Sequence, residues 1–109
     1  MYKIDNEIFL RATGVDCNSK MGKAFRVTAV TSLRKIIEEV GHNKLTNKEL
    51  AHKIKGIASA MGFNEAAYIC GQVEIYDELL SYINTRKALA EIVRNMLQSC
   101  EVREGEICL

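Results

Sequence analysis

Apolar residues recur at three- and four-residue intervals along almost the whole chain, and this helical periodicity constrains the fold more than any other feature. No segment alternates between apolar and polar residues for long enough to require a β-strand. The 109 residues contain no proline, where average usage gives about five, and proline is most disruptive inside helices. The sequence therefore predicts an all-α protein. The four apolar stripes are Phe25, Ala29, Leu33, Ile36 and Val40; Leu50, Ile54, Ile57, Ala58 and Met61; Ala66, Ile69, Cys70, Val73, Tyr76 and Leu80, which also includes an unexplained Asp77; and Leu89, Ile92, Val93, Met96, Leu97 and Cys100.

Capping residues indicate where the helices begin and end. Thr46 and Glu49 form a capping box, in which each side chain accepts a hydrogen bond from the backbone amide of the other residue. The other expected caps and stops are Ser19, Gly41, Asn64, and either Asn84 or Thr85. The expected long helices are 19–41, 47–61, 64–83 and 85–101, after a short helix at about 6–12.

Short connections between long amphipathic helices favour antiparallel neighbours. The predicted architecture is an antiparallel four-helix bundle with a short N-terminal lead-in helix. The length suits one domain, residues 1–109, and we expect a monomer whose tail, 103–109, is frayed.

Charge and cysteine usage narrow the class of protein. Fifteen basic and 14 acidic residues give a net charge of +1, which argues against a general nucleic-acid binder. The chain has no apolar signal-peptide core and no apolar run of the roughly 18 residues that a membrane helix needs. Cys17, Cys70, Cys100 and Cys108 are scattered without a Cys-x-x-Cys pair, which is typical of buried thiols. We therefore expect a cytoplasmic protein with no membrane segment, metal or cofactor.

His52 projects from the polar face of the predicted 47–61 helix. An advance of about 100° per residue places it about 200° from Leu50, opposite the apolar stripe. Lys55 and Gly56 lie near it on the same face, and Ser59 lies two turns along. A neutral imidazole nitrogen is a competent nucleophile near pH 7, and an adjacent ammonium can stabilise phosphoryl oxygens. Glycine inside a helix costs about 1 kcal/mol relative to alanine, so Gly56 suggests that a partner's backbone approaches closely.

The segment His52-Lys-Ile-Lys55-Gly56-Ile-Ala-Ser-Ala-Met-Gly62 resembles the His-x-x-Lys-Gly-x-x-x-x-x-Gly motif of histidine-containing phosphotransfer (HPt) domains. The likeness extends over about residues 4–100, including the lead-in segment Ile4–Arg11 and the segment Gly62–Glu74. It implies a phosphocarrier in a multistep two-component pathway, served by a hybrid histidine kinase and by response-regulator receiver domains.

Each role in the site follows from this resemblance. His52 would accept a phosphoryl group on Nε2 from a receiver aspartate, Lys55 would steady its oxygens, and Gly56 would make room for the receiver. Glu74 lies 22 residues after His52, as does a carboxylate that orients the histidine in the phosphotransfer domain of chemotaxis histidine kinases. An ordinary surface carboxylate remains the alternative for Glu74. Because the chain has none of the glycine-rich ATP-binding motifs of a kinase, we expect a carrier and not an enzyme.

Local charge indicates a docking face around His52. Residues 44–55 carry a net charge of +3, whereas residues 56–85 carry four acids and no base. A basic surface suits the acidic phosphorylation pocket of a receiver and would raise the encounter rate. The expected docking residues are Gly56, Ser59, Lys48 and Lys53, although the two lysines also suit solubility and Ser59 also suits a small spacer. His42, in the expected loop 41–45, is interpreted as solvated.

Two alternative functions remain open at this level. One is an adaptor that binds and sequesters a receiver without transferring a phosphoryl group. The other is a helix-turn-helix DNA-binding module, because Leu45-Thr-Asn-Lys-Glu-Leu-Ala51 resembles the opening of that motif. The expected turn glycine arrives one residue late, at Gly56, and no basic recognition helix follows, so DNA binding is the weaker alternative.

Overall fold

The computed structural model describes residues 4–100, and within that range every regular element is helical, which confirms the all-α prediction. The elements in chain order are α1 (Asn6–Thr13), α2 (Lys20–His42), α3 (Asn47–Met61), α4 (Asn64–Tyr76), the 3-10 turn η1 (Asp77–Leu79) and α5 (Tyr82–Cys100). None of these helices is both long and apolar enough to cross a membrane. The predicted frayed tail, 103–109, and Cys108 lie outside the described residues.

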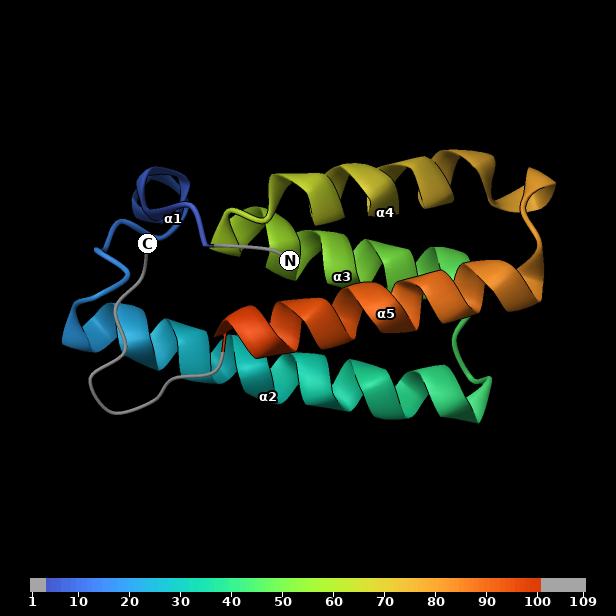
Figure 1. Cartoon of the computed structure of the whole chain (residues 1–109), viewed down its shortest axis with the longest axis horizontal. Coiled ribbons are helices and arrows are strands. Elements are labelled where there is room, and N and C mark those ends of the chain that lie inside the picture. The colour runs from blue at the N-terminus through green and yellow to red at the C-terminus, as the bar shows by residue number, and fades with distance from the viewer. Residues whose placement is uncertain (1–3, 101–109) are drawn as a thin grey trace.

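Four long helices lie lengthwise beside one another, and the shorter α1 lies across one end (Figure 1). Successive long helices reverse direction at short turns, so that α3 packs chiefly against α4 and α2 against α5. At the α3–α4 turn, Gly62 has a φ of 81° and closely approaches α1. A Cβ atom at this position would lie 2.9 Å from the carbonyl oxygen of Asp5. Only glycine suits both the positive φ and the close approach to Asp5. Any other residue would be strained in this backbone conformation, and its side chain would displace the start of α1.

The core consists largely of the predicted apolar stripes. Leu50 and Ile54 of α3 belong to the same core cluster as Leu89 and Val93 of α5. None of these four side chains is exposed. Cys17, Cys70 and Cys100 are buried, as predicted. The prediction that Phe25 of the first stripe lies in the core is wrong, since this residue is 42% exposed. Helix α2 instead turns the neighbouring Arg26 inward, where it is buried.

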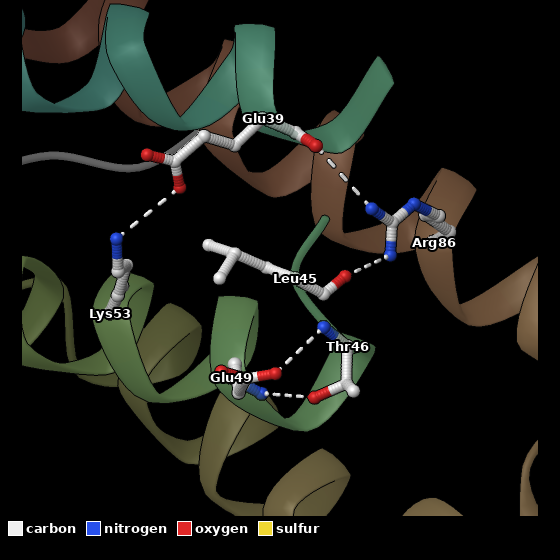
Figure 2. Close-up of polar contacts among 6 residues, drawn as sticks. All are labelled: Glu39, Leu45, Thr46, Glu49, Lys53 and Arg86. Atoms are coloured by element: carbon white, nitrogen blue, oxygen red, sulfur yellow. Dashed lines mark hydrogen bonds and ion pairs between the residues drawn. The ribbon is translucent and has the colours of Figure 1, made fainter. Parts of the chain in front are cut away.

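The predicted helix starts are confirmed for α2 and α3. Ser19 Oγ accepts from Gly22 N–H at 3.0 Å, and the Thr46–Glu49 capping box has both of its hydrogen bonds, at 3.0 and 3.1 Å (Figure 2). The start of α3 is therefore well defined, which places the helix face that carries His52.

Three predicted ends and caps are wrong. Helix α2 continues through Gly41 and ends at His42, and the capping residue after it, Asn43, adopts the left-handed conformation with φ 53°. Asn64 is the first residue of α4 and provides no side-chain cap. Helix α5 begins at Tyr82, before the predicted caps Asn84 and Thr85. The preceding residue, Ser81, provides a side-chain cap instead, since its Oγ accepts from Asn84 N–H at 3.3 Å.

The predicted 64–83 helix is interrupted. Helix α4 ends at Tyr76, and η1 and a short turn lead into α5. The expected burial of Tyr76 and Leu80 is wrong for this reason, and both are exposed. The interruption also accounts for Asp77, which lies on η1 and not on an apolar helix face.

Arg86 of α5 connects the elements around the α2–α3 loop, a role that the sequence did not predict. Its side chain is almost fully buried, and its guanidinium donates to the backbone carbonyls of Val40, Leu45 and Glu39 at 2.9, 3.0 and 3.4 Å, and to Asn47 Oδ1 at 2.9 Å. Figure 2 shows the contacts to Glu39 and Leu45. These bonds satisfy carbonyls that a helix end and a loop leave without intrahelical partners.

Candidate functional site

Helix α3 presents His52 to solvent while its opposite face is in the core. The His52 side chain is 73% exposed, whereas Leu50 and Ile54 have no exposed surface. This is the orientation that the helical phase of the sequence predicts. Because α3 continues unbroken through Lys55 and Gly56 to Met61, the turn that a helix-turn-helix motif would require there does not form.

Glu74 of α4 contacts His52 across the α3–α4 interface. Its Oε2 lies 3.1 Å from His52 Nδ1, and its side chain is only 18% exposed. An ionised carboxylate can only accept hydrogen bonds, so Nδ1 must carry the proton in this contact. The lone pair of the neutral ring is then on Nε2, on the other side of the imidazole.

Lys55 pairs with the second oxygen of the same carboxylate. Its Nζ lies 2.8 Å from Glu74 Oε1, and its side chain is 37% exposed. The aliphatic part of Lys55 passes over Gly71, where an added Cβ atom would be 3.9 Å from Lys55 Cδ.

These contacts keep Glu74 ionised. The Lys55 ammonium is the largest cause that holds the pKa of the Glu74 carboxyl below its ordinary value, and the hydrogen bond with His52 acts in the same direction against partial desolvation. One turn earlier, burial and then the negative charge of Glu74 raise the pKa of the Cys70 thiol to about 12. Cys70 is accordingly an uncharged packing residue beneath the site and a poor nucleophile.

Gly56 opens the surface next to the His52–Lys55–Glu74 cluster. Among the described residues, no atom outside its own helix backbone lies within 4 Å of the position that a Cβ atom would take. A hollow of about 200 Å³ adjoins Gly56, with an apolar lining that includes Phe25, Ile57 and Met61. The surface around Gly56 therefore has no protruding side chain at position 56, is apolar, and is accessible to a partner.

The other three predicted docking residues, Lys53, Lys48 and Ser59, lie in three different environments. Lys53 pairs with Glu39 of α2 at 3.3 Å, on the side of α3 that faces α2 (Figure 2). Lys48 lines a hollow of about 430 Å³ that it shares with Glu74 and the end of α4. Ser59 is exposed further along α3. The structure thus brings together His52, Lys55 and Glu74, and it places Lys53 apart from them.

The predicted loop residue His42 is instead the last residue of α2, where it is exposed. Within residues 4–100, no three His, Cys, Asp or Glu side chains lie close enough to share a metal ion. Comparisons with protein-family models, curated proteins and solved structures gave no match, so the function has to be inferred from the residues and their geometry.

Proposed function

We propose that this chain is a phosphorelay intermediate whose five helices form an HPt-type antiparallel four-helix bundle with a lead-in helix. His52 accepts a phosphoryl group from a receiver aspartate and passes it to a second receiver, downstream of a hybrid histidine kinase. The observation that carries this proposal is the contact of Glu74 with His52 Nδ1, which leaves Nε2 as the nucleophilic nitrogen on an exposed helix face.

The transfer exchanges one bond to phosphorus for another. The Nε2 lone pair of His52 attacks the phosphorus of the receiver's aspartyl phosphate, a nitrogen–phosphorus bond forms, and the phosphorus–oxygen bond to the aspartate breaks. The aspartate leaves as a carboxylate, and the proton on Nδ1 stays in place. The ring then carries positive charge, which the ionised Glu74 stabilises at 3.1 Å.

Lys55 supplies the nearest positive charge for the incoming phosphoryl oxygens. Before transfer its ammonium is held by Glu74 at 2.8 Å. Because lysine has a flexible stem, its ammonium can move from the carboxylate to a phosphoryl oxygen with little rearrangement. A unit-charge pair at about 4 Å is worth about 4 kcal/mol at an effective dielectric constant of 20, which is enough to favour transfer without trapping the product.

The surface around Gly56 supports docking of a receiver. The missing side chain allows a close approach, and the adjoining apolar hollow offers surface that a partner can desolvate. Lys48 and Ser59 are exposed on α3, one turn before His52 and one turn after Gly56, whereas Lys53 is paired with Glu39.

Transfer from a phosphorylated receiver tests this function directly. We expect a receiver carrying ³²P-labelled aspartyl phosphate to label the chain with an acid-labile, base-stable phosphoryl group. His52→Gln should abolish labelling, and His42→Gln, which alters the other exposed histidine, should leave it intact. Labelling that persists in His52→Gln would refute the assignment. Stable receiver binding without labelling would favour the non-transferring adaptor.

A further inference from the structure

The turn that joins α4 to α5 lies at one end of the molecule (Figure 1), and large apolar side chains in and beside this turn are exposed. Leu79 is 83% exposed, the highest value among the large apolar side chains of residues 4–100. We call this surface the apolar tip. It consists of Ile75, Tyr76, Leu79, Leu80, Tyr82 and Ile83, all of them exposed. Ile75, Tyr76 and Leu79 line one hollow, and Tyr82 and Ile83 line another. Exposed apolar side chains that gather in one region of a small protein mark interaction sites.

The apolar tip is acidic on its α4 side. Asp77 and Glu78 lie on η1, and both line the same hollow as Ile75 and Leu79. Glu74 and Lys48 line it too, so the hollow has three acids against one base. No lysine or arginine occurs between residues 56 and 85. A surface that covers this side must therefore offer positive charge as well as apolar area.

The α5 side of the same tip has the opposite charge. A groove of about 540 Å³ lies between α2 and α5, which we call the α2–α5 groove, and Ile83, Val40 and Ala90 supply its apolar lining. Lys87 and Arg94 add positive charge along it, against a single acid, Glu91. The groove is large enough to accept a leucine side chain, and its charge matches that of η1.

We propose that the occupant of the apolar tip is a second copy of this chain. In a two-fold symmetric interface the same patch meets itself, so a patch with an acidic half and a basic half is self-complementary. Leu79 of each copy enters the α2–α5 groove of the other, and Asp77 and Glu78 face Lys87 and Arg94. The turn after α4 and the start of α5 lie at the same end of the molecule (Figure 1), and residues of both halves belong to these elements. The two contacts can therefore form together and close the dimer.

This proposal replaces the monomer expected from the sequence and does not require that the chain transfer phosphoryl groups. The expected 64–83 helix would have buried Tyr76 and Leu80 on an apolar stripe. The observed break at Tyr76 instead leaves these side chains outside the core, next to the acids of η1. The apolar surface and its charge pattern therefore arise from the turn, which the sequence pattern did not predict.

Sedimentation velocity of the full chain tests the dimer. Between about 1 μM and 1 mM we expect a concentration-dependent monomer–dimer equilibrium. Leu79→Ser should raise the dimer dissociation constant at least about 10-fold, as expected for a central apolar anchor. Leu10→Ser is the matched control, since it alters an exposed leucine on α1, and it should change nothing. A monomer throughout the range, or a dimer unaffected by Leu79→Ser, would overturn the proposal.

Charge reversal tests the arrangement of the two copies. Glu78→Lys and Lys87→Glu should each weaken self-association about 10-fold or more, because each variant brings like charges together across the interface. An equimolar mixture of the two variants should associate again as a heterodimer, since both cross-contacts then pair opposite charges. Failure of the mixture to associate would rule out the proposed contact between η1 and the α2–α5 groove.

Discussion

The Glu74 carboxylate of α4 lies 3.1 Å from Nδ1 of His52 on α3, and its other oxygen lies 2.8 Å from Nζ of Lys55. One carboxylate, contributed by a neighbouring helix, thus contacts both of the residues that would perform the proposed transfer. It determines that Nδ1 is the protonated ring nitrogen, and it pairs with the Lys55 ammonium through its second oxygen.

Glu74→Gln should reduce phosphoryl transfer to His52 by about 10- to 100-fold, the size of the effect when a carboxylate that orients a metal-ligating histidine is removed. The amide can still form a hydrogen bond, but it cannot stabilise positive charge on the ring. ¹⁵N NMR of the imidazole should show a smaller population protonated at Nδ1. Glu65→Gln, at an exposed acid on the same helix, is the control. An unchanged tautomer ratio and an unchanged rate would remove the orienting role.

Lys55→Ala should slow transfer about 10-fold or more, because the phosphoryl oxygens lose their nearest cation. The fold should remain intact, since the side chain lies on the polar face of α3, outside the core. Single-turnover transfer kinetics and chemical denaturation together measure both effects. Lys53→Ala, which breaks the pair with Glu39, should leave the rate within about twofold of wild type. Equal slowing in both variants would indicate a general charge effect.

Gly56→Arg should weaken binding of a phosphorylated receiver and leave the stability of the isolated protein unchanged or slightly higher. The site has room for a side chain, and glycine is the poorer helix former by up to about 1 kcal/mol. Gly41→Arg is the matched control, because Gly41 is also helical, exposed and open. Receiver affinity measured by titration calorimetry should fall only for Gly56→Arg. An equal affinity in both variants would place the receiver interface elsewhere.

The contribution of Glu74 to stability should depend on pH. Its pKa in the folded protein lies below the ordinary value of 4.5, so its ionised form is favoured by folding. The stabilisation is complete above pH 4.5 and is lost as the pH falls through the lower folded-state pKa. Denaturation of wild type and Glu74→Gln at pH 7, 4.5 and 3 measures this difference. A wild-type advantage that persists unchanged at the lowest pH would contradict the ion-pair explanation.

Arg86→Ala should lower the free energy of unfolding by at least about 2 kcal/mol, because it leaves buried carbonyls at the α2–α3 loop without donors. Arg86→Lys should recover only part of this, since an ammonium cannot span all of the acceptors. Urea denaturation measures both variants, with Arg11→Ala on exposed α1 as the control. If Arg86→Ala lowers the free energy of unfolding no more than Arg11→Ala does, the hydrogen bonds of Arg86 contribute little to stability.

Features that depend on residues close together in the chain were predictable. The capping box Thr46–Glu49 marks the start of α3, and the 3.6-residue period from Leu50 places His52 opposite the core. Both depend on the geometry of a single helix, which local hydrogen bonding and side-chain spacing largely determine. The all-α class followed in the same way, from several such segments in one chain.

Features that depend on packing between helices were not predictable from the sequence pattern. The apolar stripe continues past Tyr76, so the sequence pattern predicted one helix where the structure has a break. Periodicity alone does not indicate which residues of a stripe pack against another helix. The four hydrogen-bond acceptors of Arg86 lie 39 to 47 residues away in the chain, and no local signal connects them to Arg86.

The candidate site shows the same division between local and long-range effects. The sequence by itself determined that His52, Lys55 and Gly56 share an exposed helix face, since one turn of α-helix brings them together. Whether Glu74 was an ordinary surface carboxylate or a partner of His52 depended on the register of α4 against α3, which core packing sets. Only the tertiary structure decided that Glu74 contacts both His52 and Lys55.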